Sequence, residues 1–139
     1  GEVIFKKYSP MGDLTDFAGQ ICDAIGKNTG HMAAVCDRDS VIAVAGAPRR
    51  ELLDKRCSQE LERLMEARRN YRAQEGESPV CAVDGLERYH VGVAAPILAG
   101  GDLMGCVLLL LGAEDAPLGE GELKLVQTVA GFLGRQMEG

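Results

Sequence analysis

The residues able to perform thiol, metal or acid–base chemistry are five cysteines and two histidines. The cysteines are Cys22, Cys36, Cys57, Cys81 and Cys106, and none lies at zinc-like spacing from another cysteine or from a histidine. Their odd number argues against a disulfide framework. Cysteines in apolar segments behave as small hydrophobic residues. The sequence therefore predicts reduced thiols and no metal site.

Nucleophilic catalysis would require one of these thiols, or Ser58, beside a general base such as His31 or His90. None of these residues lies in a nucleophile motif such as GxSxG. His31 opens a predicted strand after a helix-closing glycine, and His90 lies within another strand pattern. Spacing along the chain does not place a base beside a nucleophile. We therefore expect no catalytic residues and no enzyme activity.

Two adjacent arginines, Arg49 and Arg50, occupy the first turn of a predicted helix in the segment "GAPRREL". The helix dipole favours anions at this position and disfavours cations. The pair either helps to hold an anionic ligand or is solvated and neutralised by Glu51 or Asp54. The sequence leaves both interpretations open and favours the second.

The composition of the chain indicates one globular domain. It has 139 residues, of which 46% are hydrophobic and 26% charged, and its net charge is −6. An acidic domain lacks the basic surface that phosphate neutralisation requires, so we expect no direct binding to nucleic acid. No apolar run approaches the ~20 residues of a membrane span. With reduced cysteines, this predicts a soluble cytoplasmic protein without membrane association.

The hydrophobic periodicity predicts the element order α-β-β-α-α-β-β-β-α. Strands that cluster, rather than alternate with helices, indicate an antiparallel sheet covered by helices, which is the α+β class. Ser58 is expected to cap the third helix, and "AGGD" to form a tight hairpin. The strands are expected at residues 31–36, 41–45, 80–83, 89–98 and 103–111, and the last helix at 120–137.

The last helix carries two apolar stripes, whereas one is enough to dock a helix on a sheet. The stripe with coiled-coil-like steps is Leu123, Val126, Ala130, Leu133 and Met137, and the second is Leu125, Val129 and Phe132. Two stripes suggest a second contact, with the first helix and with the symmetry copies of both helices. From the first helix, Leu14, Phe17 and Ile21 are expected to contribute. We expect a homodimer, and the alternative is a helix packed deep in a monomer.

Four separated segments resemble the stage V sporulation protein T family, transcription regulators of endospore-forming bacteria. They are "GEVIFKKYSP", "GHMAAVCDRDSVIAVAG", "YHVGVAAPILAGGDLMGCVLLLL" and "AGFLGRQMEG". The similarity spans nearly the whole chain and is weakest over residues 72–88. In that family an AbrB-type DNA-binding domain, built from swapped hairpins, precedes a C-terminal GAF domain.

This resemblance implies a GAF domain over residues 11–139. Its central antiparallel sheet would carry the terminal helices on one face, and two short helices plus loops on the other. Residues 1–10 would be a remnant of the missing DNA-binding domain, with Val3–Tyr8 frayed or paired with another copy. DNA would be bound only through that domain, which would activate or repress sporulation genes.

The resemblance also implies a small-molecule pocket between the sheet and the helices that follow its second strand. The residues in that region are Cys36, Ser40, Arg49, Arg50, Cys57, Leu61, Met65, Cys81 and Tyr89. The cyclic-nucleotide signature of GAF domains is not recognisable, and no cysteine has a bilin-attachment context. We therefore expect no cofactor. The ligand is unknown, and some GAF domains bind none.

Three functions follow. The first is a regulatory module that forms a dimer, or a tetramer in a longer protein, and senses a small molecule. The second is a dimerisation module without a ligand. The third is a cysteine-dependent enzyme similar to the GAF-fold methionine sulfoxide reductases, with Cys57 or Cys81 as the nucleophile. The match to a regulator favours the first.

Overall fold

The structure is a computed structural model that describes residues 10–138, with side chains from Leu14 onward. The predicted remnant at residues 1–10 and its strand Val3–Tyr8 lie outside this range, except for Pro10, which begins the first helix. The elements in chain order are α1 (Pro10–Thr29), β1 (Met32–Asp37), β2 (Val41–Ala45), α2 (Arg49–Leu52), α3 (Gln59–Glu66), β3 (Tyr71–Arg72), β4 (His90–Ala99), β5 (Asp102–Leu111) and α4 (Glu120–Met137).

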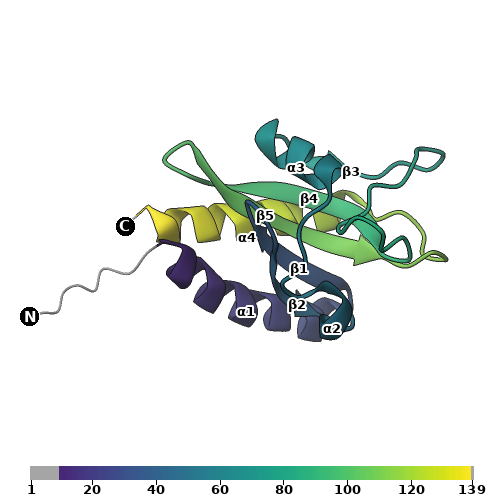
Figure 1. Cartoon of the computed structure of the whole chain (residues 1–139), viewed down its shortest axis with the longest axis horizontal. Helices are drawn as coiled ribbons and strands as arrows, with labels where there is room; N and C mark the ends of the chain where they lie inside the picture. The colour runs from purple at the N-terminus through teal and green to yellow at the C-terminus, as the bar shows by residue number, and fades with distance from the viewer. Residues whose placement is uncertain (1–9, 139) are drawn as a thin grey trace, which may run out of the picture.

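A single antiparallel sheet forms the centre of the domain, with strand order β2-β1-β5-β4-β3. The α1 and α4 helices lie against one face, and α2, α3 and long loops cover the other (Figure 1). The predicted α+β class and arrangement of layers are confirmed. The expected β4–β5 hairpin is also present, and Gly100 and Gly101 have the positive φ angles (59° and 91°) of its tight turn.

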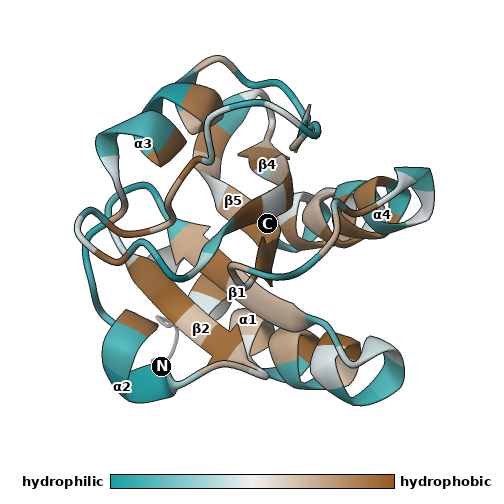
Figure 2. Cartoon of the chain, turned by 90° about the vertical axis from the view of Figure 1, so that its right-hand side faces the viewer, coloured by the Kyte–Doolittle hydropathy of each residue, from teal (hydrophilic) through white to brown (hydrophobic). Residues whose placement is uncertain are grey.

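The sheet is buried on both faces, which explains the unbroken apolar run of β5. Alternate residues point to opposite faces, so Val107 and Leu109 join the cluster under α1 and α4. Leu108 and Leu110 join the cluster under α3. The strands are accordingly the most hydrophobic part of the chain, whereas α2 and the connecting loops are largely hydrophilic (Figure 2).

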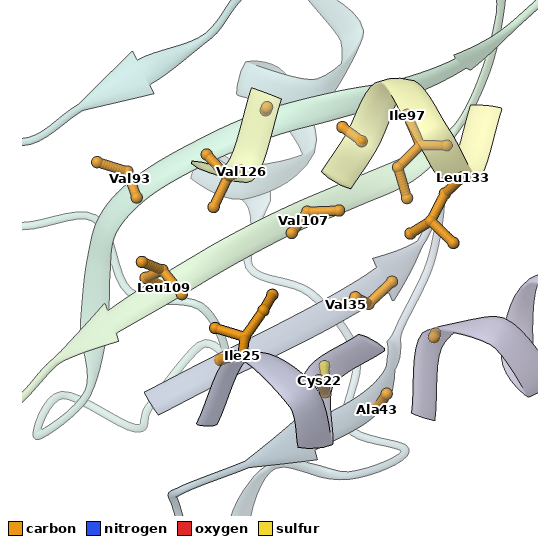
Figure 3. Packing of buried hydrophobic residues seen from close by; sticks show 14 of the residues in the cluster. Cys22, Ile25, Val35, Ala43, Val93, Ile97, Val107, Leu109, Val126 and Leu133 are labelled. Carbon is orange, nitrogen blue, oxygen red and sulfur yellow. The ribbon is translucent and has the colours of Figure 1, made fainter. Parts of the chain in front are cut away.

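The α4 helix packs very closely on β4. Val126 and Leu133 of α4 face Val107 and Ile97 of the sheet (Figure 3). At Gly134 the helix backbone approaches the carbonyl of Leu98 so nearly that an added Cβ would lie 2.1 Å from its oxygen. Close helix–sheet contact therefore depends on a glycine in the last turns of α4.

The edge strand of the sheet differs from the one predicted. Tyr71 and Arg72 form β3 and pair with Ala94 and Val93, whereas residues 80–83 make only isolated bridges. The reason is that α3 ends at Glu66 and Arg68 adopts a positive φ of 54°, which redirects the chain to the edge of the sheet. Tyr71 and Arg72 therefore form the edge of the sheet, where the sequence predicts residues 80–83.

Candidate functional site

The pocket residues expected from the resemblance do not all lie together. Four of them, Cys36, Cys57, Leu61 and Met65, have side chains no more than 3% exposed and pack in one apolar cluster. Other members of the cluster, from the strands and from α2, fill the space beneath α3. Tyr89 packs against it while partly buried. The space between the sheet and α3 thus contains this chain's own side chains.

The remaining pocket candidates lie around that cluster. Arg49 and Arg50 are exposed on α2, whereas Ser40 and Cys81 are partly exposed. Glu51 pairs with Arg88 from the loop before β4, and not with either arginine of α2. The expected neutralisation of Arg49 and Arg50 by Glu51 is therefore not seen. Instead, the Glu51–Arg88 ion pair connects α2 to the loop that precedes β4.

Several of the thiols have pKa values shifted against ionisation. A hydrogen bond with Cys57 and burial raise the pKa of Cys36, and burial raises that of Cys22 and of Cys106 to about 12. Burial, followed by the carboxylates of Glu87 and two other acidic residues, raises the pKa of Cys81. Nucleophilic attack and metal binding both require the thiolate. These four thiols are therefore poorly suited to either role.

The polar candidates for catalysis are engaged in structural contacts. Ser58 is fully buried; its Oγ donates to the Cys81 carbonyl (2.7 Å) and accepts from the Leu61 N–H (3.0 Å). This confirms the predicted cap of α3. His31 Nε2 lies 3.4 Å from Glu122 Oε2, which joins the start of β1 to the first turn of α4. Within residues 14–138, no group of three or more His, Cys, Asp or Glu side chains is arranged to hold a metal ion.

The predicted interface residues divide into two groups. Leu14, Val126, Ala130 and Leu133 are at most 2% exposed and belong to the core of this chain; Figure 3 shows Val126 and Leu133 against the sheet. Phe17, Ile21, Leu123 and Met137 are partly buried at its margin. The second stripe of α4 is more accessible, because Phe132 is 46% exposed. Its ring meets Phe17 edge to face at 6.5 Å.

Open space lies beside α3 rather than beneath it. A cavity of about 690 Å³ runs between the end of α3, the β1–β2 turn and the start of β5. We call it the α3 cleft, and its lining residues are Arg38, Asp39, Glu66, Arg68, Asp102, Leu103 and Met104. Sequence reasoning missed it because these residues come from three separate segments. The local signal in the sequence is the charged segment "DRDS" between β1 and β2.

The fold defines the class of the protein. The chain superposes on the GAF domain of PixJ from Thermosynechococcus elongatus with a TM-score of 0.71, 16% identity and coverage of 96% of this chain and 89% of that one. The second GAF domain of DevS from Mycobacterium smegmatis superposes with a TM-score of 0.67 and 15% identity, covering 91% of this chain and 94% of that one. The GAF domain of CodY from Clostridium difficile superposes with a TM-score of 0.59 and 13% identity, covering 99% of each chain. This chain has the GAF-like fold.

The particular family follows from sequence. Residues 13–138 match the model of the stage V sporulation protein T C-terminal domain, described as a transcription factor. Stage V sporulation protein T of Bacillus subtilis (strain 168) is 44% identical over 142 residues, covering 99% of this chain and 76% of that protein. The chain belongs to this family, and the resemblance inferred from the four segments is confirmed. No helix among the described residues is both long and apolar enough to span a membrane.

Proposed function

We propose that this chain is a non-enzymatic regulatory domain that pairs two copies through the α1–α4 face and relays a small-molecule signal to a DNA-binding domain. The single observation that carries the pairing is the apolar stripe of α4 around Phe132. Phe132 is the one large hydrophobic residue among residues 14–138 that is exposed, at 46%. Exposed apolar surface on a helix already docked on its sheet is typical of an interaction site.

The stripe continues onto α1. Leu125 and Val129 flank Phe132 and are only partly buried, as are Phe17 and Ile21 of α1. The two helices lie on the same face of the sheet (Figure 1), so their apolar residues form one surface. A second copy related by a two-fold axis would bury the same surface on both partners.

A role in gene regulation is supported by the family, whose model is described as a transcription factor. This chain is acidic, with a net charge of −6, so DNA contact is assigned to a separate domain. The match leaves part of the Bacillus subtilis relative outside the aligned region, and we propose that a DNA-binding domain occupies that part. The five free cysteines are consistent with a cytoplasmic location.

Signal sensing is supported by the similarity of fold to a domain described as the cofactor-binding GAF domain of the nutrient sensor CodY. In the present chain the space under α3 is filled by side chains. A ligand would control the domain only if it bound two conformations with different affinity. The proposal therefore requires a ligand site coupled to the paired helices.

The pairing is tested by the variant Phe132→Glu, measured by light scattering coupled to size exclusion. We expect the wild-type mass to be twice the chain mass of 14.8 kDa, and the variant to fall to a single chain with an unchanged circular dichroism spectrum. Lys124→Glu is the matched control, since Lys124 lies on the exposed polar side of α4. A wild-type monomer, or a Phe132→Glu dimer, would contradict the proposal. Leu133 is unsuitable for this test because it is fully buried and a charge there would disrupt the core.

A further inference from the structure

We propose that the α3 cleft binds a small amphoteric ligand of the amino-acid type with a cationic side chain, and that this occupancy is read by α4. The regulatory part of this inference rests on the proposed function, whereas the binding part stands alone. The volume of about 690 Å³ is within the usual range for ligand sites, roughly 300–1,000 Å³.

One wall of the cleft is fixed by backbone hydrogen bonds. Asp37 Oδ1 accepts from the N–H groups of Asp39 (2.7 Å) and Ser40 (2.8 Å), which shapes the β1–β2 turn. The Asp39 carbonyl accepts from the Cys57 N–H at 2.9 Å, which ties this turn to the segment before α3. The side chains of Arg38 and Asp39 are therefore presented from a rigid turn, so little ordering entropy opposes binding.

The opposite wall is held by Arg68. Its Nε donates to the Gly101 carbonyl at 3.3 Å and its guanidinium Nη1 to the Glu66 carbonyl at 3.4 Å, leaving its other N–H groups for a ligand. Arg68 also has a φ of 54°, the left-handed conformation in which it turns the chain away from the end of α3.

The charges of the cleft define the chemistry of its ligand. Two arginines, Arg38 and Arg68, line the cleft together with three carboxylates, those of Asp39, Glu66 and Asp102. Within residues 14–138, none of these five groups forms an ion pair with another residue. Their side chains therefore keep unused hydrogen-bonding capacity.

With two arginines and three carboxylates, the lining of the cleft has a net charge of −1. A nucleotide or other polyanion is disfavoured by this balance, because it would meet more carboxylates than arginines. A ligand with one carboxylate and two cationic groups complements it, with its carboxylate on an arginine and its cations on the acids. Leu103 and Met104 supply apolar wall against which a methylene stem can pack. Lysine and arginine have this constitution.

The tip of the β4–β5 hairpin links the cleft to α4. Gly101 accepts from Arg68, and the adjacent Gly100 N–H donates to Glu138 Oε2 at 3.3 Å, directly after the last turn of α4. The hairpin tip, the end of α4 and the start of α1 all lie at the same end of the molecule (Figure 1). A ligand that pulls on Arg68 or Asp102 therefore acts on the end of α4, where a domain preceding α1 would also join.

Isothermal titration calorimetry of the 139-residue chain with L-lysine and L-arginine tests the site. We expect saturable binding that weakens with added salt. Norleucine, which lacks the side-chain cation, and cadaverine, which lacks the carboxylate, should each bind at least ~10-fold more weakly, the usual effect of one charge-assisted hydrogen bond.

Matched variants locate the binding. Asp102→Asn and Arg38→Gln should each weaken lysine binding about 10-fold or more, whereas Glu114→Gln, which removes one exposed negative charge outside the cleft, should not. Absence of saturable binding up to about 10 mM lysine and arginine, or equal effects of the Asp102 and Glu114 variants, would overturn the inference. Light scattering of the same samples separates it from the pairing proposal. A dimer without lysine binding refutes only the site, and a monomer that binds lysine refutes only the pairing.

Discussion

Gly134 offers the sharpest test of how α4 meets the sheet. It lies in the helix, where alanine is intrinsically preferred over glycine by about 1 kcal/mol. An alanine Cβ at this position would, however, lie 2.1 Å from the Leu98 carbonyl oxygen and 3.1 Å from its carbonyl carbon. Real Cβ atoms essentially never come closer than 3.0 Å, so the helix would have to move away from β4 by roughly 1 Å.

The expected effect of Gly134→Ala is a net loss of stability. The neighbouring Leu133 is fully buried and Ala130 is 2% exposed, so a shift of α4 loosens tightly packed contacts. Overpacking of a core costs about 1–3 kcal/mol. At its upper end this outweighs the propensity gain and leaves a loss of about 2 kcal/mol.

Gly131 is the matched control in the same helix. Nothing lies within 4 Å of a Cβ added there, and the residue is exposed. Gly131→Ala should therefore stabilise the protein by about 1 kcal/mol. Urea unfolding followed by circular dichroism at fixed protein concentration measures both variants. If Gly134→Ala were as stabilising as Gly131→Ala, α4 would not approach β4 as closely as described, and the packing argument would fail.

Three further outcomes are expected. Ser58→Ala removes a helix cap whose hydroxyl is fully buried and leaves the Cys81 carbonyl without its donor, so it should lower the free energy of unfolding by about 1–3 kcal/mol; an equal loss in the exposed Ser78→Ala would contradict this. The partly exposed Cys81 should react slowly with iodoacetamide at pH 7 and faster as pH rises, because its raised pKa keeps it protonated; fast alkylation at neutral pH would revive the cysteine enzyme. The backbone N–H of Gly119 lowers the pKa of Glu122, so this carboxylate stabilises the fold above its ordinary pKa of 4.5 and the contribution is lost as pH falls through the lower folded value. Glu122→Gln should therefore flatten the acid limb of the stability profile, and an unchanged limb would remove Glu122 from this role.

The prediction of most elements from the sequence succeeded because their signals are local. The apolar runs of β1, β2, β4 and β5 and the period-3.6 pattern of α4 predict these elements at nearly the observed bounds, and the hairpin at Gly100 and Gly101 is encoded by its two adjacent glycines. The cap at Ser58 is local as well. Strand β3 was missed because a two-residue strand has no periodicity and exists only through its pairing with β4.

The sequence predicts two apolar stripes on α4 but does not show which of them packs on the sheet. The stripe with coiled-coil-like spacing, which includes Val126 and Leu133, packs against the sheet and is buried. Phe132 of the second stripe is the exposed one. Periodicity shows that two faces are apolar, whereas only packing shows which face the sheet occupies.

The sequence by itself determined the class of fold, the family and the order of elements, because hydrophobic period, turn glycines and family-specific segments are properties of contiguous residues. The tertiary structure decided where space remains. The region under α3 is occupied by Cys36, Leu61 and their neighbours. Arg38, Arg68 and Asp102, which come from three separate segments, line one cleft. A cavity is the volume left after every side chain has packed, so it is a property of all the contacts together and of no single stretch of chain.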